Sequence, residues 1–115
     1  MKVNIRETDR IVIFDLRGKI SGNDDVELKK LVNNQIAAVS GKPKFLFNFA
    51  DVTGMDTNGF EAIVGARLAV ERKGGRVGAI NVGANIHNLL VVSRLTTTFE
   101  HFDTEAQAIE SLRSA

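Results

Sequence analysis

This sequence of 115 residues contains no cysteine, and that absence removes several classes of site. A disulfide framework, a thiolate ligand for a metal and a cysteine nucleophile are all excluded. Tryptophan and tyrosine are missing too, and 15 Lys and Arg residues against 14 Asp and Glu residues give a formal net charge of +1. Near-zero charge and scarce aromatic residues argue against a dedicated nucleic-acid-binding protein.

Long apolar runs are also missing. No window approaches the roughly 20 apolar residues of a membrane-spanning helix, and residues 1–7 lack the apolar core of a signal peptide. We therefore expect a cytoplasmic protein without direct membrane insertion. There is one proline and no linker-like stretch, so the chain is expected to form a single domain over residues 1–115.

Apolar spacing predicts an α/β fold. Val3 and Ile5 alternate with polar neighbours, as in a half-exposed strand, and residues 11–16 form a dense β-branched strand ended by Gly18. The short link between the two favours an antiparallel hairpin. Residues 45–49 are apolar at nearly every position, which is typical of a central strand covered on both faces. Further strands are predicted over residues 77–82 and 99–102.

Four helices are predicted between and after these strands. Ser21 and the acidic residues up to Asp25 are typical of a helix start, and Gly41 with Pro43 predicts the end of that helix. The order β-β-α-β-α-β-α-β-α predicts a mixed, mostly parallel sheet of about five strands with about four helices. Apolar residues at helical spacing are Val26, Leu28, Leu31, Val32, Ile36 and Val39 in the first helix, Phe60, Ile63, Val64, Leu68 and Val70 in the second, Ile86, Leu89 and Leu90 in a third over residues 85–94, and Ala106, Ile109 and Leu112, facing inward, in a fourth capped by Thr104.

The most informative stretch is the polar segment of residues 51–59, predicted as a loop before the second helix. Asp56 fits an N-cap, which places Thr57 at the first helical position with its hydroxyl in solvent. A helix start tolerates an added phosphate, because its dipole and open amides favour an anion. With Asp51 and Asp56 nearby in sequence, phosphorylation would make a surface that repels a partner accepted before. Ordinary capping and turn chemistry explains the same residues without any modification.

Motifs for catalysis and cofactor binding are not found. The sequence contains neither of the glycine-rich phosphate-binding patterns and no Gly-x-Ser-x-Gly. His87 and His101 lie on different predicted elements, whereas a zinc site needs three or four ligands. We therefore expect no enzymatic activity, no cofactor and no metal.

Residues 46–60 (LFNFADVTGMDTNGF) resemble the signature of the STAS domain, the family of bacterial anti-sigma-factor antagonists. That signature is an apolar strand, an Asp, a short apolar gap, and Met or Ile before Asp-Ser-Ser-Gly-Leu. Here Thr57 and Asn58 replace the two serines, and Phe60 replaces the leucine. The resemblance covers nearly the whole chain and implies a single STAS domain. It includes residues 16–20 and 74–77 and the C-terminal positions Leu95, Phe99, Phe102, Thr104, Glu105 and Ala106.

The resemblance implies a regulatory protein-binding module. In the family, a serine kinase that is also an anti-sigma factor phosphorylates the residue after the motif Asp. The unphosphorylated antagonist binds that kinase and frees the sigma factor, and a phosphatase resets the system. Carried over, Thr57 is the phosphorylation site, Asp56 orients the loop and contacts the partner, and Gly59 keeps the helix start open for close approach. The expected partner-binding residues are Asp51, Asp56, Thr57, Asn58 and Gly59, together with Asn23 and Asp24, because loops at one end of a parallel sheet converge.

A second interpretation assigns the chain to another class of STAS protein. Relatives that serve as adaptors bound to the ATPase of a lipid-transporting ABC system carry a Thr after the motif Asp, as Thr57 does here. Both interpretations use the same surface. They differ in the partner and in whether Thr57 is modified.

Overall fold

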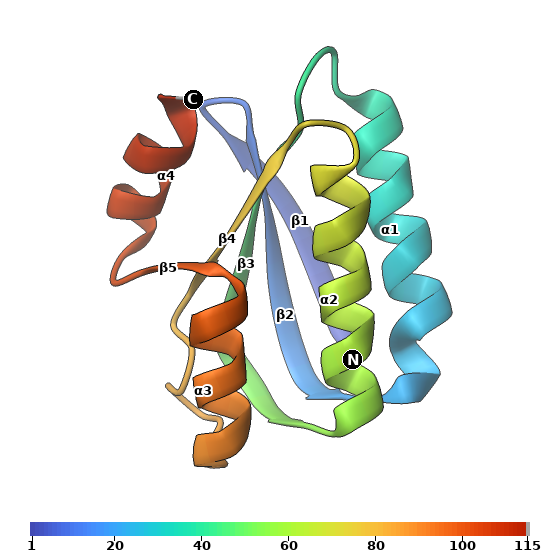
Figure 1. Ribbon diagram of the computed structural model, residues 1–115, viewed down its shortest axis with the longest axis vertical. Coiled ribbons are helices and arrows are strands. Elements are labelled where there is room, and N and C mark those ends of the chain that lie inside the picture. Colours follow the sequence, from blue (N-terminus) through green and yellow to red (C-terminus); the bar gives the residue numbers. More distant parts are fainter. Residues whose placement is uncertain (115) are drawn as a thin grey trace.

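A computed structural model describes residues 1–114 as one five-stranded sheet flanked by four α-helices (Figure 1). The strands run in the order β1-β2-β3-β4-β5; β1 pairs with β2 antiparallel, and all other pairs are parallel. The predicted α/β fold and element order are confirmed. The strands are β1 (Lys2–Thr8), β2 (Ile11–Ile20), β3 (Lys44–Met55), β4 (Arg76–Ile80) and β5 (Glu100–Phe102); the helices are the 3₁₀ helix η1 (Gly22–Asp24), α1 (Asp25–Ala38), α2 (Thr57–Glu71), α3 (Leu89–Thr98) and α4 (Glu105–Arg113).

The sheet buries apolar side chains on both faces. Along β3, Phe45, Phe47 and Phe49 share a core with residues of α1, α2 and α3. Leu46 points the other way, into a smaller core that contains Leu112 of α4. Two covered faces explain why this strand is apolar at successive positions. The prediction of a central strand is confirmed.

The two central strands are longer than the sequence suggested. Gly18 does not end β2: it has a positive φ of 85° and lies at a register irregularity, after which β2 pairs with β3 as far as Ile20 and Met55. A glycine of this kind allows a bulge within a continuing strand. The predicted loop over residues 51–59 is therefore wrong, because β3 continues to Met55, with Val52 and Met55 buried, and α2 begins two residues later.

The third helix begins later than predicted. Asn88 caps α3, since its side-chain oxygen accepts from the backbone N–H groups of Leu90 and Val91 at 3.0 and 3.3 Å. Ile86 is buried but lies in the preceding segment. Leu89 and Leu90, expected as the apolar face of this helix, are 82% and 61% exposed.

Two smaller expectations about helix faces are also corrected. Val26 shares the apolar spacing of α1 but is 78% exposed, because it lies in the first turn, beyond the edge of the core. In α4, Ala106 is exposed and Ala108 is buried against the sheet instead. The predicted cap of α4 is confirmed: Thr104 Oγ1 accepts from Gln107 N–H at 3.1 Å.

Within residues 1–114, no helix has both the length and the apolar character needed to cross a membrane.

Candidate functional site

The starts of α1, α2 and α3 lie at the same end of the sheet (Figure 1). This end is where β2 and β3 finish, with Ile20 paired to Met55. The backbone N–H of Asp56 donates to the carbonyl of Ile20 at 3.3 Å, which attaches the entry of α2 to the end of β2. The carboxyl ends of parallel strands are the usual place for binding sites in open α/β sheets.

Asp56 and Thr57 form the start of α2 as predicted. Asp56 Oδ1 accepts from the backbone N–H of Gly59 at 2.7 Å, which is N-cap geometry. Thr57 is the first helical residue, and it is exposed. The arrangement therefore presents a hydroxyl group to solvent beside a carboxylate whose position is fixed by the helix backbone.

Gly59 has a different role from the one expected. It is buried, and a Cβ built there would lie 2.7 Å from the carbonyl carbon of Ile20 and still closer to the carbonyl oxygen. Its missing side chain thus allows α2 to approach β2 within the chain, instead of leaving space for a partner. Gly59 is buried within the chain, and its contact with a partner stays a prediction.

A hollow of about 230 Å³ opens beside Thr57, between α2 and α3. Among residues 1–114, the charged residues that line it are Asp56 and Arg94, and Arg94 comes from the second turn of α3. Sequence reasoning did not place α3 next to Thr57, because the hollow joins two helices that are far apart in the sequence and no local pattern indicates their contact. The hollow is lined by Met55, Asp56, Thr57, Phe60, Asn88, Leu90, Val91 and Arg94.

A second hollow, of about 500 Å³, lies on the other side of the start of α2 and contains two of the predicted partner residues. Asn23 of η1 and Asn58 of α2 both line it. A Cβ at Gly22 would lie 2.8 Å from Asn58 Cβ, so this glycine permits the close approach of η1 to α2. Asp24 is engaged locally, since its Oδ2 accepts from the backbone N–H of Ser21 at 2.8 Å. The convergence of residues 22–25 with the start of α2 is confirmed.

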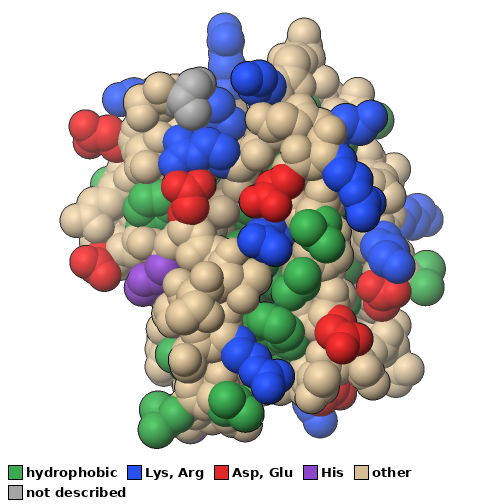
Figure 2. All heavy atoms as spheres, viewed as in Figure 1, with side chains coloured by type: hydrophobic (Ala, Val, Ile, Leu, Met, Phe, Trp, Pro, Cys, Tyr) green, Lys and Arg blue, Asp and Glu red, His purple; other side chains and the backbone are tan. Residues whose placement is uncertain are grey.

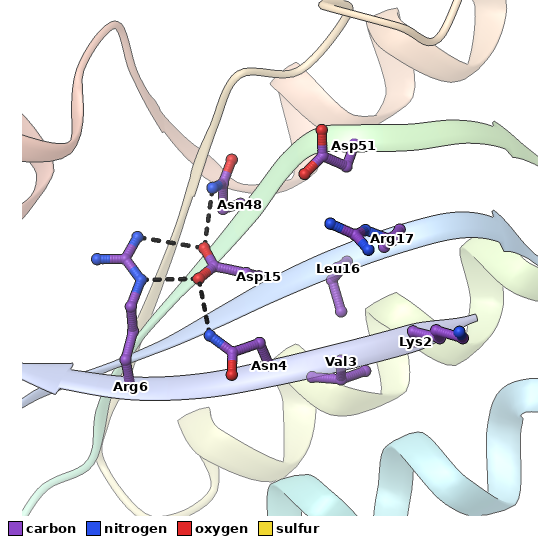
Figure 3. A pocket seen from close by; sticks show the side chains of 9 residues that line it. All are labelled: Lys2, Val3, Asn4, Arg6, Asp15, Leu16, Arg17, Asn48 and Asp51. Atoms are coloured by element: carbon purple, nitrogen blue, oxygen red, sulfur yellow. Dashed lines mark hydrogen bonds and ion pairs between the residues drawn. The ribbon is translucent and has the colours of Figure 1, made fainter.

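Asp51 lies away from this end, on the opposite face of the sheet. It is an exposed residue of β3, paired in register with Arg17 of β2, and it lines a polar hollow of about 470 Å³ (Figure 3). Asp56 follows Asp51 by five positions of extended chain, a distance of about 15 Å. The expectation that both carboxylates would crowd a phosphate on Thr57 is wrong for Asp51 and holds geometrically for Asp56.

The polar hollow around Asp51 contains a network that sequence reasoning did not find. Asp15 accepts from Arg6 Nε at 2.7 Å and from Asn48 Nδ2 at 2.9 Å (Figure 3). Arg6 also donates to Glu105 of α4. Hydrogen bonds from Arg6, against the effect of burial, hold the pKa of Asp15 below its usual value. A charged residue inside the apolar run of residues 11–16 was the indication available in the sequence. The network joins β1, β2 and β3 to α4.

Arg67 of α2 is not a free charge. Its Nη1 donates to the carbonyl of Thr98 at 3.0 Å, and its guanidinium carbon lies 6.0 Å from the centre of the Phe99 ring. This side chain ties α2 to the end of α3. Glu61 and Glu71 of the same helix are exposed.

Metal-ligating side chains do not gather anywhere in residues 1–114: no group of three or more His, Cys, Asp or Glu residues is placed to hold an ion. His87 and His101 are both exposed and lie on separate segments. The polar groups around the start of α2 are the Thr57 hydroxyl, the Asp56 carboxylate, the backbone amides of the first turn and the Arg94 guanidinium from α3.

Comparisons with solved structures identify the fold. The unphosphorylated anti-sigma factor antagonist SpoIIAA is 19% identical, with 99% of this chain and 100% of that chain covered and a TM-score of 0.73. The phosphorylated form of the Bacillus cell-fate determinant SpoIIAA is 21% identical, with 97% and 100% covered and a TM-score of 0.67. A putative anti-sigma factor antagonist from Thermotoga maritima is 19% identical, with 96% and 94% covered and a TM-score of 0.78.

Comparison with curated protein sequences gives no match. At identities near 20%, the solved structures show the fold and not the activity. The sequence model of one family, described as the STAS domain, matches residues 2–108. Since this match covers far more than half of the sequence, the chain belongs to the STAS domain family.

Proposed function

We propose that this STAS domain is a non-catalytic regulatory module that binds a kinase-type anti-sigma factor and is switched by phosphorylation at Thr57. The observation that carries the proposal is the exposed hydroxyl of Thr57, at the first position of α2, beside the capping carboxylate of Asp56. A kinase would form a bond from Thr57 Oγ1 to the γ-phosphorus of ATP, release ADP and pass the hydroxyl proton to solvent. A phosphatase would hydrolyse the new ester.

Exposed apolar side chains support a protein partner at this end of the molecule. Leu89 and Leu90 start α3, and Val26 lies in the first turn of α1. Figure 2 shows hydrophobic side chains standing out at the lower left, over the start of α3. Apolar side chains that gather on an otherwise polar surface mark interaction sites. The most exposed large apolar residues thus share one end with Thr57.

Phosphorylation would change the charge of this surface strongly. A phosphothreonine carries about −1.5 to −2 charges at neutral pH. It would stand beside Asp56, with Glu61 one helical turn further along the same side of α2. A partner that docks on Leu90 and Phe60 would meet a hydrated dianion where it had met a methyl group and a hydroxyl. We therefore expect phosphorylation to release the partner.

The test is a set of four baits used on lysate of the native organism, with captured proteins identified by mass spectrometry. The baits are the wild type, Thr57→Glu, the neutral isostere Thr57→Gln, and Thr53→Glu, which adds the same charge at an exposed residue of β3. We expect a kinase-like ATPase with the wild type, Thr57→Gln and Thr53→Glu, and its loss with Thr57→Glu. Equal capture of the kinase by all four baits would refute the switch.

The same experiment examines the alternative function. An adaptor for a lipid-transporting ABC system would capture the transporter ATPase. The replacement of the family's Ser by Thr at position 57 is the observation that favours this alternative. In that case Thr57 would act in capping and packing, and binding would not depend on its charge.

A further inference from the structure

We propose that Arg94 of α3 binds the phosphate group when Thr57 is phosphorylated, so that the chain carries its own receptor for the modification. This inference rests on the proposed phosphorylation of Thr57 but concerns what the phosphate contacts afterwards. Thr57 and Arg94 line the same hollow, of about 230 Å³, although they are 37 residues apart in sequence and come from different helices.

Arg94 is available for such a contact. Its side chain is exposed, and within residues 1–114 its guanidinium takes part in no hydrogen bond or ion pair. By contrast, Arg6 pairs with Asp15, and Arg76 pairs with Glu100. Arg94 therefore loses no existing interaction when it turns toward a new anion.

The charges around Thr57 make a counter-charge necessary. Asp56 lines the hollow, and Glu61 lies one helical turn from Thr57 on α2. His87, the nearest titratable residue in the segment before α3, is exposed and does not line the hollow. Glu61 lines the second hollow, where Lys29 also lies. Arg94 is thus the cation that the hollow beside Thr57 offers to a phosphate beside Asp56. A guanidinium and a phosphate form bidentate, charge-assisted hydrogen bonds, which are stronger than neutral ones.

The contact would also change what a partner meets. A phosphate held by Arg94 would bridge from α2 to α3 across the hollow, above Phe60 and Leu90. The modification would then close the hollow as well as add charge. The same guanidinium would no longer be available for a carboxylate of the partner.

The test uses the full chain with phosphothreonine installed at position 57 during synthesis, so it does not depend on a kinase. ³¹P NMR titration measures the second pKa of the phosphate in three forms: the wild type, Arg94→Gln and Arg72→Gln. Arg72 is an exposed residue at the far end of α2, about 22 Å from Thr57 along the helix. It is therefore a matched control for the loss of one positive charge.

We expect Arg94→Gln to raise the pKa of the phosphate by about 0.5 unit, the size of an exposed ion pair, and Arg72→Gln to leave it unchanged. The difference should shrink in high salt. Circular dichroism of each form checks that the fold is retained. Equal pKa values and equal ³¹P chemical shifts in the two variants would overturn the inference. Failure of the proposed function would appear separately, as equal capture by the charged and neutral baits.

Discussion

Two glycines of α2 allow the packing of this helix to be tested. The same substitution, glycine to alanine, is expected to lower the free energy of unfolding at one position and to raise it at the other. Replacing Gly59 by alanine puts a methyl group 2.7 Å from the carbonyl carbon of Ile20 and closer to its oxygen. Replacing Gly65 by alanine, two turns later, puts a methyl group where no heavy atom lies within 4 Å. Both residues are helical, so the backbone preference for alanine is common to the two variants.

The magnitudes follow from these two environments. Alanine in a helix is favoured over glycine by about 1 kcal/mol, so Gly65→Ala should stabilise the protein by about 0.5–1 kcal/mol. At Gly59 the same gain is opposed by overpacking, which costs about 1–3 kcal/mol. The atoms in the way belong to the backbone of β2 and cannot rotate aside, so the cost should lie at the upper end. We expect Gly59→Ala to destabilise the protein by about 2 kcal/mol.

Urea unfolding measures this difference directly. The chain has no tryptophan or tyrosine, so the transition should be followed by circular dichroism at 222 nm. The unfolding midpoint should rise for Gly65→Ala and fall for Gly59→Ala, with little change in slope. Each kcal/mol corresponds to about 4 °C in the thermal midpoint. Shifts of the same sign in both variants would refute the claim that α2 is pressed against the end of β2 at Gly59.

Three further predictions concern capping and charge. Asp56→Ala should lower the free energy of unfolding by about 1 kcal/mol, as measured by urea unfolding. Asp56→Ser should keep most of the stabilisation that the cap provides, because serine is also a good N-cap residue. Asn88→Ala should cost a similar amount by the same assay, and an equal stability of mutant and wild type would contradict its role as the cap of α3. Asp15→Asn should destabilise the protein at pH 7, because the carboxylate that Arg6 and Asn48 hold is lost. Since the pKa of Asp15 is lower in the folded chain, its contribution is complete above about pH 4 and disappears as the pH falls further, so the stabilities of the variant and the wild type should converge in acid.

The parts of the fold that the sequence predicted are those with strong local patterns. The run of phenylalanines in residues 45–49 predicted a strand covered on both faces, and Asp56 and Thr104 predicted the caps of α2 and α4. The predicted end of the strand at Gly18 is wrong, because a glycine with positive φ occurs in a bulge as well as in a turn. Only the pairing of β2 with β3 through Met55, a long-range property, distinguishes the two cases.

The site was predicted less completely than the fold for the same reason. Thr57 and Asp56 are adjacent, so their relation can be read locally. Arg94 reaches the same hollow only through the crossover that places α3 beside α2. Asp51 was grouped with Asp56 because sequence distance is a poor guide along an extended strand, where five residues span about 15 Å. The continuation of β3 placed Asp51 on another face.

The tight attachment of α2 decides what kind of switch a phosphate on Thr57 can operate. The entry of the helix is held by the hydrogen bond from Asp56 N–H to Ile20, by the cap at Gly59 and by the contact of Gly59 with β2. A new charge at an exposed position contributes about 1 kcal/mol through its interactions. This is too little to displace the first turn of α2, which these three contacts hold. We therefore expect phosphorylation to leave the backbone in place and to act through the charge and the solvation of the surface around Thr57.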